Sequence, residues 1–270
     1  LHLSQTMIIS WQLLFGQGLV KTTSNFGSLG ASPSHPELLD WLAVEFIKQK
    51  WSLKSMHRLI MNSATYRQSS KVTQRHEELD LENNLLSRWP IKRMDGETLR
   101  DSLLLVSGRL DKTRFGPPDP IFVRADGLAT GYSREKGWRR SIYLSQPRLT
   151  SATTLDLFDY PQMNPNCVER SQSTVASQAL HLLNDANIRS LANFLAGQVI
   201  YESDYELEKQ IVKIYWIILN RPPDPKEKRI TIESVKATLE GLNQGSKPLT
   251  MVLAKLVHTL FNSAAFIYID

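Results

Sequence analysis

Two stretches near the N-terminal end of the chain place apolar residues at the period of an α-helix. The first follows Ser34-His-Pro-Glu37, which has the form of a capping box with proline in the first turn, and it predicts a helix over about residues 35–49. Ser52 is expected to cap a second helix. The short connection between them predicts an antiparallel helical hairpin. The apolar positions are Leu38, Leu39, Leu42 and Phe46 in the first helix, then Leu53, Met56, Leu59, Ile60 and Ala64 in the second.

Helical patterns return later in the chain, where aspartates stand at the expected starts of helices. Asp95 is expected to cap a helix that ends near Gly108, and Asp185 to cap the second of two helices over about residues 174–184 and 187–200. In the last part of the chain, Asp224-Pro-Lys-Glu227 has the form of a capping box between two further helical patterns. These observations predict a main helical domain over residues 1–203 and a C-terminal helical subdomain over residues 204–270.

The centre of the chain, residues 112–165, has a residue pattern that differs from that of the helical segments. Glycine and proline occupy turn positions in FGPPDP, DGLATGYS and YPQMNP, and no helical period continues for more than one turn. RRSIYLSQ, residues 139–146, alternates polar and apolar side chains as a half-buried strand does, and PIFVRAD, residues 120–126, is its expected partner. The predicted fold class is therefore mainly α, with helical hairpins, a small irregular β/loop insert and a C-terminal three-helix subdomain.

Composition and charge narrow the function classes. The chain of 270 residues carries 32 Lys and Arg against 27 Asp and Glu, a net charge of +5. The basic residues are dispersed among the acidic ones, whereas duplex binding usually requires a concentrated basic stripe, so we expect no nucleic acid among the partners. The longest apolar run is too short to span a bilayer. No signal peptide is visible in the chain.

The chemical motifs are few. The chain has neither a dinucleotide-binding nor a phosphate-binding glycine motif, and His76-Glu77 lacks the second histidine of a zinc helix. Its single cysteine, Cys167, excludes an intrachain disulfide, a paired-thiol zinc site and the C-x-x-C-H attachment of a c-type haem. We interpret Cys167 as a structural residue of a loop that leads into the helix near Thr174. A reactive thiol beside Arg170 is the alternative.

No metal site and no cofactor are predicted within the chain. The histidines at positions 35, 57, 181 and 258 lie in helical stretches, and none is paired with another at a spacing of four residues. Ser173 and Thr174 are expected to be helix caps. Carboxylates in the irregular centre include Asp126, Glu135, Asp156 and Asp159, but the sequence does not fix their separation.

Arginines and aromatic residues are concentrated in several short segments. They include Tyr66-Arg67, Arg88-Trp89, Trp138-Arg139-Arg140 and Tyr143, with Arg148 and Arg170 nearby in the sequence. Arginine can bind carboxylate, sulfate or phosphate through two hydrogen bonds, and aromatic faces stack on sugars or cations. The alternative is structural: the arginines pair with Asp or Glu and fix the non-helical centre.

The segments named above resemble, in order, a C-terminal domain of unknown function from secreted planctomycete proteins. The resemblance rests on residues 15–70, 88–111, 137–144, 155–185 and 219–227, and it extends from about Trp11 to Asp270. Where that family commonly has an Asn-Arg-hydrophobic-Trp stretch, this chain reads IISW, and Ala265 replaces a common acidic residue. The matched positions, whose roles are unassigned in the family, are His35, Pro36, Glu37, Tyr66, Arg67, Arg139, Arg140, Tyr143, Cys167, Arg170, Gln178 and Asn184.

The resemblance implies an extracytoplasmic, for instance periplasmic, setting in a multidomain protein that often carries a c-type cytochrome module elsewhere. We therefore expect no cofactor in this chain, a c-type haem in an upstream part, and the other domains of the same protein as partners. A saccharide or an anionic substrate is the expected ligand, in a redox or polysaccharide-processing protein. A non-catalytic interaction scaffold is the alternative, and no reaction follows from the sequence. The candidate ligand-binding residues are Arg67, Arg139, Arg140, Tyr143, Arg170 and Gln178.

Overall fold

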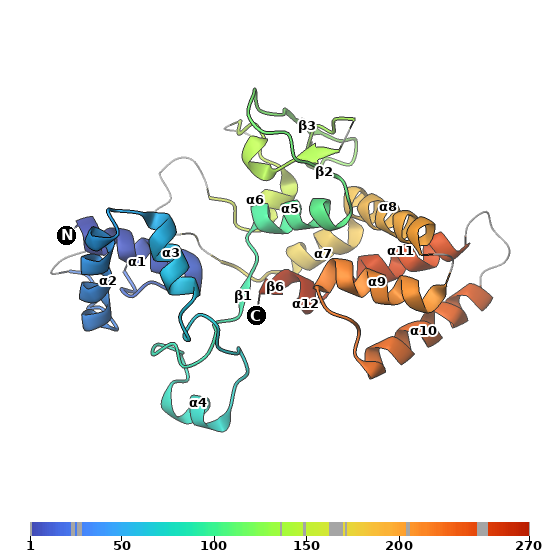
Figure 1. Cartoon of the computed structure of the whole chain (residues 1–270). Coiled ribbons are helices and arrows are strands. Elements are labelled where there is room, and N and C mark those ends of the chain that lie inside the picture. Colours follow the sequence, from blue (N-terminus) through green and yellow to red (C-terminus); the bar gives the residue numbers. More distant parts are fainter. Residues whose placement is uncertain are drawn as a thin grey trace. The chain divides into compact units, whose positions relative to one another are not determined.

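Two large hydrophobic cores organise the described part of the chain, each within its own compact unit, and a small third cluster around Leu155 lies in unit 2. The computed structural model describes residues 2–22, 25, 29–135, 137–147, 150–161, 170, 172–203, 206–241 and 248–269. Unit 1 is built mainly from Leu1–Lys92, and unit 2 from Arg93–Pro165 and Arg170–Tyr268. The chain crosses between the units within the short strands β1 (Lys92–Arg93) and β6 (Tyr268–Ile269). The described part is mainly α-helical, as the sequence predicts (Figure 1).

Unit 1 is a small helical unit with an aromatic core. Residues of α1, α2 and α3 share one cluster of buried side chains, and within it the rings of Trp11 and Phe15 stack 4.3 Å apart while Trp89 contacts Phe15 and Tyr66. Helix α2 packs mainly against α1, for which the sequence gives no prediction, rather than against α3, its predicted hairpin partner. The bounds are α1 (His2–Phe15), α2 (Pro36–Lys48), α3 (Leu53–Met61) and α4 (Gln74–Leu79).

The two predicted serine caps of unit 1 have different outcomes. Ser52 caps α3, because its hydroxyl accepts a hydrogen bond from the backbone of Ser55 at 3.3 Å, as predicted. Ser34 does not cap α2, and the prediction of a capping box there is wrong. The Ser34 hydroxyl instead donates to the carbonyl of Leu19 at 3.2 Å, which ties the start of α2 to the segment after α1.

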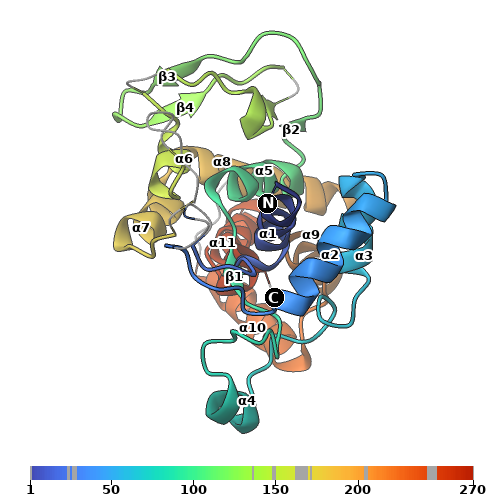
Figure 2. The ribbon, with the colours of Figure 1, turned by 90° about the vertical axis from the view of Figure 1, so that its left-hand side faces the viewer.

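Unit 2 is centred on the packing of α8 against α11, with α9 and α10 beside them. Figure 2 shows the same unit from a second side. Helices α5, α7 and α8 begin in the predicted regions, and Asp95, Asp185 and Asp224 cap α5, α8 and α10 as predicted. The remaining bounds are α5 (Gly96–Val106), α6 (Thr153–Leu157), α7 (Ala176–Asn184), α8 (Ala186–Glu202), α9 (Leu207–Leu219), α10 (Pro225–Glu240), α11 (Pro248–Phe261) and α12 (Ala264–Ile267).

The C-terminal helices share the core of the helices before them. Leu191, Leu195 and Val199 of α8 belong to the same buried cluster as Leu253 and Val257 of α11. The predicted boundary at residue 204 stays a prediction, but the packing of α8 on α11 crosses it. No helix of the described residues is both long enough and apolar enough to span a lipid bilayer.

The described residues in and next to the irregular centre of unit 2 form two short strand pairs. Strand β3 (Ile121–Val123) pairs antiparallel with β4 (Ala129–Gly131), and β2 (Leu110–Asp111) pairs parallel with β5 (Trp138–Arg139). A Cβ atom at Gly131 would overlap the side chain of Leu144, so a larger residue there would require that buried leucine to move.

The predicted strand over residues 139–146 is wrong beyond Arg139. Ser141–Tyr143 form a 3-10 turn, and the strand over residues 121–123 pairs with β4 rather than with this segment. Ser141 gives the physical reason: its backbone N–H and its hydroxyl both donate to Asp101 of α5 at 2.8 Å, which fixes the chain against α5 instead of a strand. Ile142 consequently lies 82% exposed, although the alternating pattern predicts an inward side chain.

Candidate functional site

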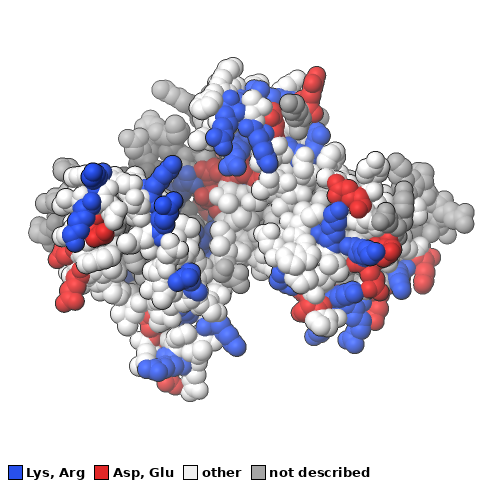
Figure 3. Space-filling view, in the orientation of Figure 1, with Lys and Arg blue, Asp and Glu red and all other residues white. Residues whose placement is uncertain are grey.

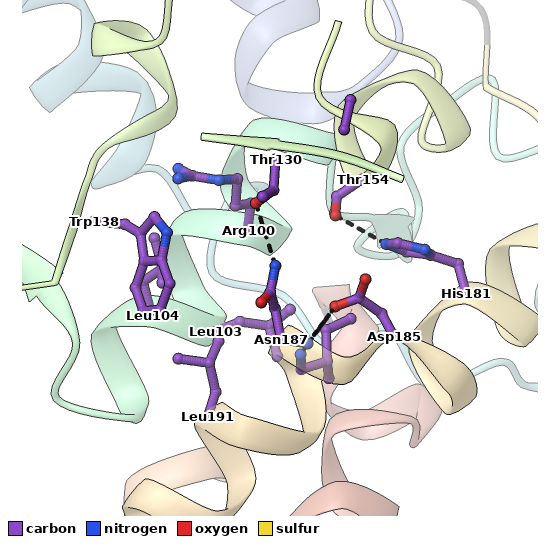
Figure 4. Close-up of a pocket in the computed structure, with 12 residues that line it drawn as sticks. Arg100, Leu103, Leu104, Thr130, Trp138, Thr154, His181, Asp185, Asn187 and Leu191 are labelled. Carbon is purple, nitrogen blue, oxygen red and sulfur yellow. Dashed lines mark hydrogen bonds between the residues drawn. The ribbon is translucent and has the colours of Figure 1, made fainter. Parts of the chain in front are cut away.

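A cavity in unit 2 lies where α5, β4, α6 and the α7–α8 junction meet (Figure 4). The volume that a water-sized sphere can occupy is about 50 Å³, enough for a few water molecules or one hydroxylated group. Its lining combines charged and amide side chains with an apolar wall. The lining residues are Arg100, Leu103, Leu104, Ala129, Thr130, Trp138, Thr154, His181, Asp185, Asn187, Ile188 and Leu191.

The junction between α7 and α8 positions one side of the cavity. The Oδ1 atom of Asp185 accepts hydrogen bonds from the backbone N–H groups of Asn187 at 2.8 Å and Ile188 at 3.1 Å. This is an N-cap, and it fixes the first turn of α8. Asn187 is thereby held with its side-chain amide toward β4, where Nδ2 donates to Thr130 Oγ1 at 3.2 Å.

Arg100 places a buried guanidinium group on the opposite side. Its Nη1 atom donates to the carbonyl of Arg139 at 3.0 Å and to the hydroxyl of Ser141 at 3.2 Å. Burial lowers the pKa of Arg100 below the usual value of arginine, although the charges of Asp101 and Asp119 act in the opposite direction. Because arginine stays protonated, this group brings a positive charge and directed N–H donors to the cavity.

Arg100 has its acidic partner in Asp101 at 3.5 Å, and a second carboxylate of the lining, Asp185, is bonded to Arg124. The Oδ2 atom of Asp185 accepts from Nη1 of Arg124 at 3.0 Å, and Arg124 also pairs with Asp126. Hydrogen bonding to Asp126, followed by the charge of Asp185, raises the pKa of Arg124 against the effect of burial. Since both ends of the Asp185 carboxylate are bonded, this part of the site is rigid.

His181 and Thr154 form a second polar pair at the cavity. The imidazole Nε2 atom lies 2.9 Å from the Thr154 hydroxyl. Burial lowers the pKa of His181, with Asp185 opposing and Arg124 adding to that effect. A neutral imidazole at neutral pH can exchange donor and acceptor roles with the hydroxyl.

Trp138 is part of the apolar wall of the cavity. The indole Nε1 atom donates to the carbonyl of Gly131 at 3.1 Å, which fixes the orientation of the ring. The guanidinium of Arg109 lies 5.7 Å from the Trp138 ring centre and 4.8 Å from that of Phe194. The wall of the cavity therefore contains an indole ring of fixed orientation.

The six candidate residues predicted from the sequence are in separate environments, and none of them is in the described lining of this cavity. Arg139 is fully buried and is ion-paired with Asp119 at 2.9 Å, with the ring of Tyr143 stacked 4.6 Å from its guanidinium. Arg140 follows it in the chain and is exposed. Arg67 is exposed on unit 1, after α3.

Arg170 and Gln178 connect segments of unit 2. Both terminal nitrogens of Arg170 donate to the carboxylate of Glu97 in the first turn of α5, at 2.8 and 2.9 Å. Gln178 is buried, accepts from Arg93 at 2.6 Å and donates to the carbonyl of Leu157 at 2.8 Å. These contacts match the structural alternative weighed for the arginines. A ligand-binding role for the six residues stays a prediction.

Arg93 and Asp159 complete the network around Gln178. Arg93 donates to Asp159 Oδ2 at 2.7 Å, and the hydroxyl of Ser173 donates to Asp159 Oδ1 at 2.7 Å. Ser173 is therefore occupied elsewhere, and its predicted role as a helix cap is wrong; Thr174 is no cap either, because the N-cap of α7 is Val175. Cys167 and Arg148 lie outside the described residues.

Arg100, Thr130 and Asn187 are not among the site residues predicted from the sequence. Arg100 and Asn187 stand at polar positions of helical patterns, and Thr130 stands in a turn-rich segment, so nothing in their spacing distinguishes them. The only available signal is Asp185, which is predicted as a cap and thereby locates the start of α8 beside the cavity.

No group of three His, Cys, Asp or Glu side chains among the described residues could hold a metal ion.

Comparison with known proteins places the chain in a family. No curated protein matches the chain, and no solved structure does either. A family model named PSD1, described as a protein of unknown function (DUF1553), matches residues 9–235, which include most of both units and all residues of the cavity lining. The chain therefore belongs to the PSD1 (DUF1553) family.

Proposed function

We propose that this chain is a binding module for a small polyhydroxylated ligand, such as the end unit of a saccharide, that inserts one hydroxylated group into the cavity of unit 2. The observation that carries the proposal is that a buried guanidinium, Arg100, and a carboxylate, Asp185, line the same cavity beside a fixed tryptophan, although each has its ion pair with another residue. Adjacent sugar hydroxyls act as both donors and acceptors, so they match a lining that offers both.

The charges of the lining favour a neutral hydroxylated ligand over an anion. Arg100 alone would attract a carboxylate or phosphate, but Asp185 stands in the same lining and is itself bonded to Arg124. An anion would meet repulsion from that carboxylate, whereas a hydroxyl can donate to it. The amide of Asn187 and the hydroxyl of Thr130 add further neutral hydrogen-bonding groups.

The wider setting that we propose is an exported multidomain protein with a c-type haem in another part. The resemblance of residues 15–70 and 155–185 to a domain of secreted proteins supports this setting. The haem would not be attached to this chain, because Cys167 is its only cysteine and a C-x-x-C-H motif needs two. Sequencing of the coding DNA upstream of Leu1 tests the setting: we expect a signal peptide and a C-x-x-C-H motif there.

A binding screen tests the ligand proposal. Soluble mono- and oligosaccharides are titrated against the chain by ligand-observed NMR, and thermal unfolding is recorded with each ligand. We expect a ligand that binds the folded chain to raise its Tm. Thr130→Val keeps the side-chain shape and removes the hydroxyl that Asn187 bonds, so affinity should fall by roughly fivefold to tenfold.

Thr238→Val is the matched control. Thr238 lies on α10, where its hydroxyl donates to the backbone of Ser234, and it does not line the cavity. The same threonine-to-valine change there should leave affinity unchanged. Equal losses in both variants, or no binding by any saccharide, would reject the proposal.

A non-catalytic interaction scaffold is the second candidate function, and exposed aromatic and aliphatic side chains favour it. Trp216, Ile230 and Met251, from α9, α10 and α11, are each about half exposed. Large exposed apolar side chains are common at protein interfaces. Capture of other domains of the full-length protein, with no saccharide binding, would favour this function.

A further inference from the structure

The corner between α2 and α3 holds two residues in a backbone conformation that normally belongs to glycine. Lys50 has a φ of 52° and Trp51 a φ of 62°. In this left-handed region the Cβ atom of an L-residue crowds the backbone, at a cost that glycine avoids. Glycine is the usual residue just after a helix, where the chain reverses.

Backbone hydrogen bonds explain the conformation without any role for the two side chains. The N–H of Lys50 donates to the carbonyl of Ile47 at 2.9 Å, and that of Trp51 donates to the carbonyl of Phe46 at 2.9 Å. Glycines could make the same bonds. The lysine and the tryptophan are therefore present despite the turn geometry, which indicates a role for their side chains.

The side chain of Trp51 is largely directed to solvent. Its ring lies 5.3 Å from that of Phe46, yet it stays 57% exposed. Other large exposed apolar side chains stand near it in the sequence on both sides, and lysines alternate with them. We call the following exposed residues the corner patch: Ile47, Lys48, Lys50, Trp51, Leu53 and Lys54.

Basic residues predominate in the chain from the corner patch onwards. Between Glu45 and Glu77 the chain has no acidic residue, and only Lys48 of the corner patch has an acidic partner, Glu45 at 3.7 Å, among the described residues. Figure 3 shows several basic side chains on unit 1, with acidic ones beside them. The basic residues of this stretch are Lys48, Lys50, Lys54, Arg58, Arg67, Lys71 and Arg75.

We propose that the corner patch docks on the surface of an anionic lipid bilayer. Tryptophan is favoured at the boundary between lipid and water, and lysines next to it bind anionic headgroups. Ile47 and Leu53 decide against a nucleic acid or a charged glycan, because those polyanions offer little apolar volume in which aliphatic side chains can be buried. A bilayer interface provides that volume. The patch would lie on the bilayer and not cross it.

Vesicle flotation with the full chain tests this proposal. Vesicles of phosphatidylcholine are compared with vesicles that also contain phosphatidylglycerol, and we expect binding to the second kind only. Combined Lys48→Gln, Lys50→Gln and Lys54→Gln should weaken it by about fivefold for each lysine, and added salt should weaken it as well.

Trp51→Gly separates docking from folding. Glycine suits the left-handed backbone, so this variant should unfold at a Tm close to that of the wild type while losing most vesicle binding. Trp216→Ala is the matched control, since Trp216 is 52% exposed on α9 of unit 2, outside the corner patch. It should bind vesicles as the wild type does.

Three results would overturn the proposal. The first is equal binding to both kinds of vesicle, or none. The second is the same loss of binding in Trp216→Ala and Trp51→Gly. The third is a different occupant of the patch: binding of duplex DNA or heparin, or self-association in sedimentation, that Trp51→Gly abolishes while vesicles are not bound.

Discussion

Arg139 donates hydrogen bonds from all three nitrogens of its guanidinium group. Nε and Nη2 bond the two oxygens of Asp119 at 2.9 Å, and Nη1 bonds the carbonyl of Phe115 at 2.9 Å. Asp119 also accepts from Arg134 at 2.5 Å. One carboxylate therefore holds two arginines and the loop before β3 in place, so the irregular centre of unit 2 depends on this residue.

Asp119→Asn should destabilise unit 2 strongly. The variant removes the charge that compensates the fully buried Arg139, and we expect the free energy of unfolding to fall by about 3–5 kcal/mol. Urea unfolding measured by circular dichroism gives this value. A loss below about 1 kcal/mol would show that water reaches the pair and screens it.

We also expect the ionisation of Asp119 to make the stability of the protein depend on pH at low pH. Burial alone would raise the pKa of Asp119, but hydrogen bonds and charge from Arg139 and Arg134 lower it below the usual 3.8. A lowered folded pKa gives stability that is complete above about 3.8 and is lost as the pH falls through the folded value. Asp119→Asn should lack this component of the acid transition.

His181 should affect stability at higher pH. Burial lowers its pKa below the usual 6.5, so the imidazole is protonated at a lower pH in the folded chain than in the unfolded chain. Stability from this group is complete above pH 6.5 and is lost between 6.5 and the lower folded value. We expect an NMR titration to give His181 a pKa below 6.5, and His181→Gln to flatten stability in that range. A pKa above 6.5 would contradict the burial argument.

At the scale of the element, capping carboxylates set where helices start. Asp224 caps α10 by accepting from the backbone of Glu227 at 2.7 Å, and the Glu227 carboxylate accepts from the backbone of Asp224 at 2.8 Å. Hydrogen bonding from Arg221 lowers the pKa of Glu227 to about 2 in spite of partial burial. The first turn of α10 is therefore closed by two reciprocal bonds and an arginine.

Asp224→Ala should cost about 1 kcal/mol of unfolding free energy, because it leaves the first backbone N–H groups of α10 without their acceptor. Chemical denaturation measures the cost. Glu233→Ala, at an exposed position in the middle of the same helix, is the control and should change stability by less than about 0.5 kcal/mol. Equal effects would mean that the cap does not stabilise α10.

At the scale of the whole molecule, the two large cores lead us to expect that each unit can lose stability without the other. Leu253 of α11 is fully buried in the core of unit 2, whereas Met56 of α3 is fully buried in that of unit 1. Leu253→Ala should cost about 2–5 kcal/mol by leaving a cavity. Hydrogen exchange should then lose protection in α8, α9 and α11 while α2 and α3 keep theirs. Met56→Ala should give the opposite pattern, and a uniform loss in both units would show a single cooperative core.

The positions of most helices could be predicted from the sequence, whereas those of the strands could not. Caps such as Asp95 and Asp185 act on backbone groups two or three residues away, so their signal is local. The segment around Ile142 shows the limit. Its alternation is typical of a strand, but Ser141 bonds Asp101, forty residues earlier in the chain, and that contact decides the backbone. The packing partner of α2, the N-terminal helix α1, depends likewise on long-range contacts.

The sequence alone determined the mainly helical character, most helix starts and the family resemblance, because helical periodicity and capping depend on near neighbours. Only the tertiary structure decided which arginines form an ion pair with a carboxylate and which line a cavity. Arg139 was predicted as a ligand-binding residue and lies fully buried on Asp119, whereas Arg100 was not predicted and lines the cavity with Asp185. The difference is physical: the role of a guanidinium is set by the partners that folding brings to it from distant segments, and burial makes those partners obligatory.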